Sequence, residues 1–220
     1  MATFQKGILG GFSGLVGTVI GSTWRTLDVL KSRPKKSKKK AVQAQIDQRL
    51  KFGMVTEFFS YLKTEIDYGY QSYKKEVMPI NAAVSYHLQN AVTGVSPNFI
   101  LDYTKVIFSI GKMKGPSNLA VTPAVGNKLK FTWDPFLAVK LRPWEKEERD
   151  KDNVVFIAYE PIKDILYPNQ VIATRGDGTF EVELNGRLEG SAVHVWLFFL
   201  SEDGKMVSGS EYFGLIKALA

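Results

Sequence analysis

The most regular pattern of apolar positions recurs every four residues between positions 41 and 66. It comprises Val42, Ile46, Leu50, Met54, Phe58, Leu62 and Ile66, and Val55 and Phe59 widen the stripe. This spacing predicts one amphipathic helix over residues 41–66. Gly53 lies inside it at a cost of about 1 kcal/mol relative to alanine, so we expect a close crossing there. A second helix is predicted over 70–93, kinked or split at Pro79.

From residue 119 the pattern changes to short alternating or continuous apolar runs separated by turn residues. About seven such runs follow, and Asp203-Gly204 is a strong hairpin signal between the last two. Seven short strands in about 100 residues are typical of an antiparallel β-sandwich. The charged insertion over residues 137–152 is expected to be a solvated loop.

Glycine interrupts the apolar pattern at the N-terminus, where Val16–Trp24 still has the composition of a strand. We expect one or two short strands over residues 1–30, with a hairpin turn near Arg25–Leu27. Residues 98–111 form another expected strand, which could pair with these glycine-rich strands. Together these patterns predict an α+β chain: a glycine-rich β segment with two amphipathic helices, then a β-sandwich.

The expected organisation has four parts. They are a glycine-rich β segment (1–30), a basic arm (31–40), a helical region with a closing strand (41–114) and a sandwich (115–220). Residues 112–118 are the best candidate for a domain boundary, because they are short, polar and contain Gly115-Pro116.

Charge concentrates in the basic arm, although the net charge of the chain is only +7. Seven of the 29 basic residues lie there, so the remaining 22 balance the 22 acidic residues. The seven are Lys31, Arg33, Lys35, Lys36, Lys38, Lys39 and Lys40. Such an arm can bind nucleic acid without sequence preference. A solubilising linker and an arm that docks onto an acidic partner are the alternatives.

Residues 7–24 form an uncharged stretch that approaches the length of a membrane span, followed by lysines. Its six glycines and its strand-like composition favour a closely packed β element instead, so membrane insertion is not expected. No secretory signal is evident, because glycine breaks the apolar run. We expect synthesis in the cytoplasm and leave the final location open.

The sequence is poor in catalytic groups. It has no cysteine and two isolated histidines, His87 and His194, each within an apolar pattern. No Ser-His-Asp order, HExxH or phosphate-loop motif occurs. The RGD tripeptide at Arg175–Asp177 precedes a strand and is expected to be a turn. We therefore predict a protein that is not an enzyme, with no cofactor and no metal site.

Two family resemblances add to this interpretation. The C-terminal half resembles a fibronectin type III or immunoglobulin-like module, through Pro116–Leu119, Leu129, Trp133 and the hairpin HVWLFFLSEDGKMVS. The whole chain resembles an uncharacterised family of Bacteroidetes proteins classed as a domain of unknown function. That resemblance lies in KGILGGFSGLVGTVIGSTW, KSRPKKSKKK, AQIDQRLKF, NAAVSYHLQNAVTG and FLSEDGKMVS. Glycine-rich strands, a basic stretch and then Gln45, Gln48, Arg49 and Phe52 are loosely similar to small proteins encoded among phage structural genes.

The function expected from these features is a structural or assembly subunit that self-associates or docks to a protein partner, in a phage-like or other particle. The residues expected to carry assembly are Gly7, Gly10, Gly11, Gly14, Gly17, Gly21 and Trp24. Sequence-independent nucleic-acid binding by the basic arm is one alternative. Recognition of a glycan or protein by the sandwich is another.

Overall fold

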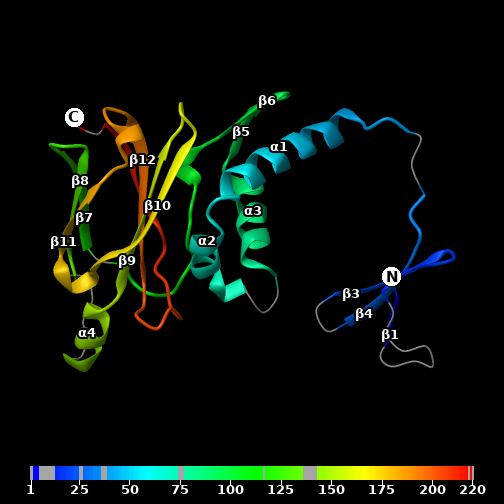
Figure 1. Ribbon diagram of the computed structural model, residues 1–220, viewed down its shortest axis with the longest axis horizontal. Helices are drawn as coiled ribbons and strands as arrows, with labels where there is room; N and C mark the ends of the chain where they lie inside the picture. The colour runs from blue at the N-terminus through cyan, green and yellow to red at the C-terminus, as the bar shows by residue number, and fades with distance from the viewer. Residues whose placement is uncertain are drawn as a thin grey trace. The chain divides into compact units, whose positions relative to one another are not determined.

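A computed structural model describes residues 2–4, 13–24, 27–35, 39–73, 77–115, 117–135, 143–217 and 219 of the chain (Figure 1). The chain divides into two compact units, Met1–Gln43 and Ala44–Ala220. The first is built from strands, and the second combines helices with a β-sandwich. The predicted α+β class is confirmed.

The first unit contains one antiparallel sheet, called the N-terminal sheet below, with strand order β1-β4-β3-β2. The strands are β1 (Ala2–Phe4), β2 (Gly14–Val16), β3 (Val19–Trp24) and β4 (Leu27–Ser32). Trp24 lies opposite Leu27, so the predicted hairpin is confirmed, while residues 25 and 26 of its turn lie outside the described residues.

The second unit begins with helices that differ from the predicted pair. They are α1 (Gln43–Phe59), α2 (Lys63–Gly69) and α3 (Pro79–Asn90), with a 3-10 turn η1 at Gln71–Tyr73. A single helix over 41–66 is wrong. The Ser60 amide bonds Glu57 O at 3.0 Å and the Leu62 amide bonds Phe59 O at 3.1 Å, and these short-range bonds end α1. Pro79 begins α3 rather than kinking it, because the first helical position needs no N–H donor.

The apolar stripe of α1 is buried only at its C-terminal end. Val55 and Phe59 are buried, whereas Ile46 and Leu50 are exposed. Gly53 also faces open space, so the expected close crossing there is wrong. The close approach occurs at Gly69 instead, where a Cβ would collide with the carbonyl group of Phe108.

A hairpin of β5 (Val92–Val95) and β6 (Asn98–Leu101) follows α3. The strand predicted over 98–111 is therefore too long, and its expected pairing with the N-terminal strands is wrong, because β6 pairs with β5. Asp102 then accepts hydrogen bonds from the Thr104 amide and hydroxyl, which starts the 3-10 turn η2 (Tyr103–Lys105).

The seven strands predicted for the C-terminal half are confirmed. They are β7 (Ser117–Ala124), β8 (Lys128–Asp134), β9 (Asn153–Glu160), β10 (Ile165–Thr174), β11 (Thr179–Glu183), β12 (Ala192–Leu200) and β13 (Glu211–Lys217). They form two antiparallel sheets, β11-β8-β7 and β10-β9-β12-β13, consistent with a fibronectin type III-like sandwich. The loop expected over 137–152 is corrected in part, since Pro143–Asp150 form helix α4. Residues 136–142 lie outside the described residues.

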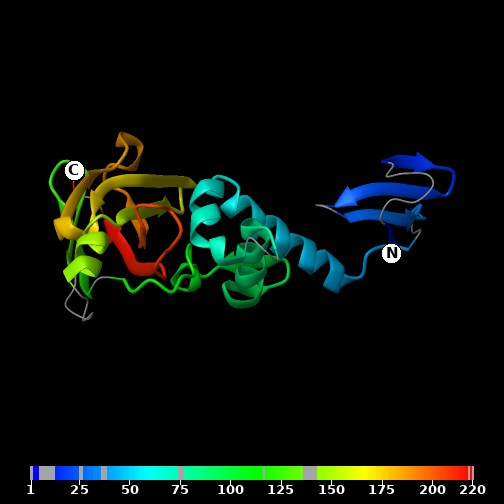
Figure 2. The same ribbon diagram turned by 90° about the horizontal axis from the view of Figure 1, so that it is seen from below.

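Two hydrophobic cores share the central strands β9 and β12. Phe156 and Phe199 face the three-stranded sheet, whereas Ile157 and Trp196 face the helices. Trp196 Nε1 also donates to the Val106 carbonyl at 3.0 Å. Figures 1 and 2 show the helices against the sandwich on that side. The boundary expected at 112–118 thus lies inside one compact unit.

Candidate interaction surfaces

The N-terminal sheet leaves apolar side chains exposed on both faces. Opposed residues of an antiparallel pair share a face, so Leu15 and Ile20 lie on one side and Val16 and Val19 on the other. Leu15 is 54% exposed and Val16 64%. Among the residues of this unit whose exposure the structure describes (13–23, 27–35 and 39–43), Gly21 and Val29 alone are buried. The described part of the unit is therefore a single sheet, with no second layer packed on it.

The glycines expected to carry assembly have different places. Gly14 and Gly21 face each other in the β2–β3 pair. Gly17 begins the turn between these strands and has a φ of +59°, a conformation that glycine adopts readily. A Cβ on Gly14 or Gly17 would meet nothing within 4 Å, so no backbone approaches them closely. Trp24 ends β3, and Gly7, Gly10 and Gly11 lie outside the described residues.

The basic arm begins inside the sheet, which corrects its expected start as a loop. Lys31 and Ser32 belong to β4, and the Arg33 amide donates to the Thr18 carbonyl at 2.8 Å. All of its described cations are exposed: Lys31, Arg33, Lys35, Lys39 and Lys40. Lys36 and Lys38 lie outside the described residues. A hollow of about 1130 Å³ places Arg33 and Lys35 beside Leu15 and Ile20, so charge and apolar surface adjoin.

His87 connects α3 to the segment after η2. Its side chain is fully buried, its Nδ1 lies 2.7 Å from the Ala83 carbonyl, and its Nε2 accepts the Ile107 amide at 3.1 Å. Nδ1 is thus the protonated nitrogen of a neutral ring. Burial lowers the pKa of His87 to about 4, and the hydrogen bond to the Ala83 carbonyl opposes this shift only in part.

His194 lies on β12 among aromatic side chains. Its Nδ1 lies 2.7 Å from the Tyr212 hydroxyl, and its ring centroid is 4.3 Å from that of Tyr103. Burial lowers its pKa from the ordinary value. Both histidines therefore hold elements together through ring contacts and hydrogen bonds.

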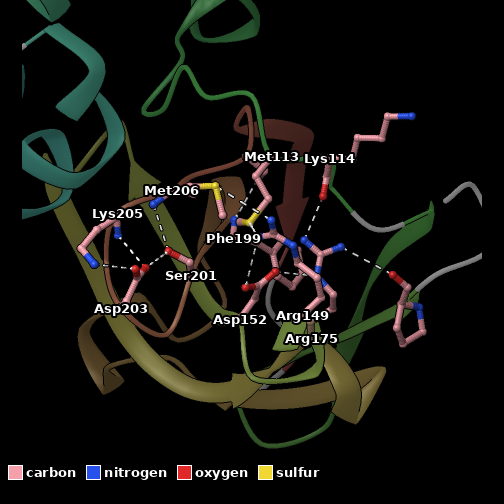
Figure 3. A network of polar contacts seen from close by, with 12 residues as sticks. Met113, Lys114, Arg149, Asp152, Arg175, Phe199, Ser201, Asp203, Lys205 and Met206 are labelled. Carbon is pink, nitrogen blue, oxygen red and sulfur yellow. Dashed lines mark hydrogen bonds and ion pairs between the residues drawn. The ribbon is translucent and has the colours of Figure 1, made fainter. Parts of the chain in front are cut away.

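The RGD tripeptide is part of a buried polar network (Figure 3). Arg175 is 2% exposed, and its Nε donates to the Asp152 carboxylate at 3.0 Å. Its other nitrogens donate to the Lys114 and Pro135 carbonyls at 2.8 and 3.5 Å. Burial raises the pKa of Asp152 against the opposing effect of the two nearby arginines. Since Arg175 is unavailable to a partner, the tripeptide is a structural turn.

Arg149 brings α4 into the same network, which explains why the charged insertion is not a solvated loop. It lies 3.7 Å from the Asp152 carboxylate, and its guanidinium also contacts the sulfur of Met113 at 2.9 Å. Trp133 donates its indole N–H to the Arg175 carbonyl at 2.8 Å. The network therefore joins α4, β8 and the turn before β11.

A cleft of about 880 Å³ in the second unit was not predicted from the sequence. We call it the acidic-aromatic cleft. Its lining comes from α1, β6, η2, β9 and β10 and from the turns after α1 and before β10: Met54, Glu57, Phe58, Tyr61, Phe99, Ile100, Leu101, Tyr103, Tyr159, Asp164, Ile165, Leu166 and Pro168. Five of these side chains are aromatic and two are acidic, and no lysine or arginine is among them. Clefts of this size and lining are typical of ligand sites.

The described residues contain no cluster of three or more His, Asp or Glu side chains placed to hold a metal ion. None of their helices has both the length and the hydropathy needed to cross a bilayer.

Comparison with known proteins places the chain in a family. A family model described as a family of unknown function, DUF6266, matches residues 11–214. The chain belongs to DUF6266. The expected membership in a domain-of-unknown-function family is thus confirmed, and the match spans both units. No curated protein matches the chain.

Among solved structures, this DUF6266 chain is similar to the crystal structure of the FN5 domain of Drosophila Lar. The two share 16% sequence identity with a TM-score of 0.31, over 48% of this chain and 95% of that chain. The strand order of the two sheets, rather than this likeness, defines the sandwich.

Proposed function

We propose that the chain is a non-enzymatic assembly subunit that self-associates through its N-terminal sheet. The observation that carries this proposal is the exposure of Leu15 and Val16 on β2, at the edge of a single-layer sheet. The structural engagement of both histidines supports the non-enzymatic part.

A single sheet is a weak structure by itself. Sheets become stable when an apolar face is covered by a second layer. The described part of the first unit offers no such layer, so another molecule of the same chain can supply it. Among the described residues, no strand pairs with the outer side of edge strand β2, so its backbone groups can extend the sheet into a partner.

The test compares the mass of the full-length chain in solution with that of a Val16→Lys, Val19→Lys double variant. Both positions are exposed, so lysine is compatible with the isolated sheet but not with a covered face. The wild type is expected to be oligomeric at micromolar concentration and the variant monomeric. The matched control replaces two exposed apolar residues of the second unit, Val125→Lys and Ile162→Lys, and is expected to stay oligomeric.

Mass photometry and light scattering can make these measurements. A wild type that is monomeric throughout the micromolar range overturns the proposal, as does a double variant that assembles as well as its control. Circular dichroism checks that each variant keeps the fold of the second unit.

Exposed cations favour a second candidate function, sequence-independent nucleic-acid binding. Lys31, Arg33 and Lys35 project from one end of the N-terminal sheet. Such binding would weaken steeply with salt. Absorbance at 260 nm of the purified chain, and titration with duplex DNA and RNA at low salt, test this candidate. Purified protein without nucleic acid that binds neither polymer would exclude it.

A further inference from the structure

The acidic-aromatic cleft has rigid aromatic walls. Phe58 packs edge-on against Tyr159 with ring centroids 5.1 Å apart, and Tyr103 lies 5.4 Å from Tyr159. These rings come from α1, β9 and η2 of one compact unit. Tyr61, beside them, is 79% exposed. The cleft therefore offers aromatic surface that is already in place before a partner binds.

Its two carboxylates are not neutralised by cations of the described residues. Glu57 is exposed, and its carboxylate has no hydrogen-bond or ion-pair partner among them. Asp164 accepts a hydrogen bond from the Tyr159 hydroxyl at 2.9 Å and forms no ion pair with them. Burial, and then this hydrogen bond, raise the pKa of Tyr159, so the phenol stays protonated.

Two lysines near the cleft make contacts other than with its carboxylates. Lys163, next to Asp164, donates its ammonium to the Arg187 carbonyl at 2.6 Å and to the Ser191 hydroxyl at 2.8 Å. Lys51 lies on the ring of Phe99, 4.6 Å from its centroid. That contact shows that an aromatic ring of this lining already accepts an ammonium group.

Negative charge and aromatic rings together select a cationic side chain. A lysine or arginine can lay its methylene stem along the rings while its charged head reaches a carboxylate. A phosphate group would be repelled by both carboxylates, which disfavours nucleic acid in this cleft. The cleft's charge is therefore opposite to that of the basic arm.

We propose that the acidic-aromatic cleft binds a lysine or arginine side chain from the basic arm, residues 31–40, of a second copy of the chain. The arm has seven cations and no acid, and the rest of the chain has no net charge. This inference rests on the proposed self-association, to which it adds a second contact. The arm binds as an extended segment, and Pro34 favours that geometry.

The first experiment measures binding of a fluorescent peptide with the sequence KSRPKKSKKK by anisotropy. The receptor is a full-length chain in which the five lysines from Lys35 to Lys40 are replaced by glutamine, so that its own arm does not compete. A Glu57→Gln, Asp164→Asn pair in this receptor is expected to weaken binding by about tenfold. Asparagine at 164 still accepts the hydrogen bond from Tyr159.

The matched control is a Glu189→Gln, Glu202→Gln pair, which changes net charge equally at two exposed positions outside the cleft. It is expected to leave peptide affinity within about twofold, because only distant, screened charges are lost. Equal weakening by both pairs, or no peptide binding, overturns the inference.

The second experiment separates a second copy from the chain's own arm. A chain with the five arm lysines replaced by glutamine is mixed with a tagged Glu57→Gln, Asp164→Asn chain that keeps its arm, and both carry Val16→Lys and Val19→Lys to remove sheet association. Pull-down of a mixed complex is expected at low salt. Its absence beside selective peptide binding means that the arm fills its own cleft, which overturns the second-copy assignment.

The two proposals fail in different ways. In one outcome, oligomers depend on Val16 and Val19, form equally well with Glu57→Gln, Asp164→Asn, and the cleft binds no peptide. This outcome leaves the sheet proposal standing and overturns the cleft proposal. A parent chain that stays oligomeric with Val16→Lys and Val19→Lys, but becomes monomeric when Glu57→Gln and Asp164→Asn are added, removes the sheet proposal alone.

Discussion

Two four-stranded antiparallel sheets in this chain have contrasting surroundings. The sheet β10-β9-β12-β13 is covered on one side by the three-stranded sheet and on the other by helices, so β9 and β12 are buried on both faces. The N-terminal sheet has exposed apolar side chains on both faces. The two sheets have the same number of strands, but one forms part of the hydrophobic core and the other has exposed apolar faces.

Composition accounts for the difference. Residues 154–159 and 193–200 are apolar in almost every position and place large side chains on both faces. The N-terminal sheet and its β2–β3 turn contain Gly14, Gly17 and Gly21, which have no side chains that could fill a core. Its remaining Leu, Val and Ile side chains are too few to stabilise a hydrophobic core by themselves. They form an exposed apolar surface of the kind that is typical of interaction sites.

The largest contrast is expected for truncation of the shared core. Phe59 is fully buried and contacts the rings of Phe58, His87 and Phe108. Phe59→Ala should lower the free energy of unfolding by about 3–5 kcal/mol, through lost burial and a cavity. Urea denaturation measures it, with Ile162→Ala, at a site 92% exposed, as the control. A loss below about 1 kcal/mol would contradict a core shared by helices and sheet.

Because of His87, the free energy of unfolding should fall by about 3 kcal/mol as the pH falls from neutral to acidic. The unfolded chain protonates this ring near its ordinary pKa of 6.5, whereas the folded chain does so near 4. The unfolded state binds more protons between these values, so acid favours unfolding. The stabilisation is complete above pH 6.5 and lost as the pH falls towards 4.

Urea denaturation between pH 7 and pH 4 measures this effect against His87→Gln, whose glutamine does not titrate. The wild type should lose more stability than the variant over that range. Parallel curves for the two proteins would mean that His87 is not held neutral by burial, and the connection between α3 and Ile107 would be looser than described.

Two glycines of the helices should respond in opposite directions to alanine. At Gly69 a Cβ would collide with the Phe108 carbonyl, so Gly69→Ala should cost about 1–3 kcal/mol or more. At Gly53 nothing lies within 4 Å, so Gly53→Ala should stabilise α1 by up to about 1 kcal/mol. Thermal unfolding of the two variants measures both effects. A change in melting temperature with the same sign in both variants would contradict the placement of α1 and α2.

Sequence patterns predicted the parts of the fold that depend on neighbours along the chain. The seven sandwich strands, the N-terminal hairpin and the helix-forming segments follow from local alternation and turn residues. The end of α1 at Phe59 did not, because the four-residue stripe continues through Leu62 and Ile66 although the chain bends. The continuous apolar runs of β9 and β12 also indicate burial on both faces, which the predicted organisation does not include.

The interaction surfaces were predictable only in part. The basic arm follows directly from composition, because seven cations in ten residues need no tertiary information. The acidic-aromatic cleft joins Phe58, Tyr103 and Tyr159, which are far apart in the sequence and meet only when α1 and η2 pack on β9. The Asp152–Arg175 pair likewise depends on the sandwich, so the RGD tripeptide gave no sign of being buried.

The smallest effect, and the one that tests the single-layer sheet most directly, is expected for Val16→Ala. Because Val16 is 64% exposed, hydrogen exchange of the β3 and β4 amides in dilute monomer should change by no more than about 0.5 kcal/mol. In the assembled state the same substitution should accelerate exchange, since the face that carries Val16 is then covered. A loss of about 1.5–3 kcal/mol at every concentration, as for a buried valine, would show that the chain covers Val16 itself. The contrast between the two sheets would then disappear, and with it the reason for a second copy.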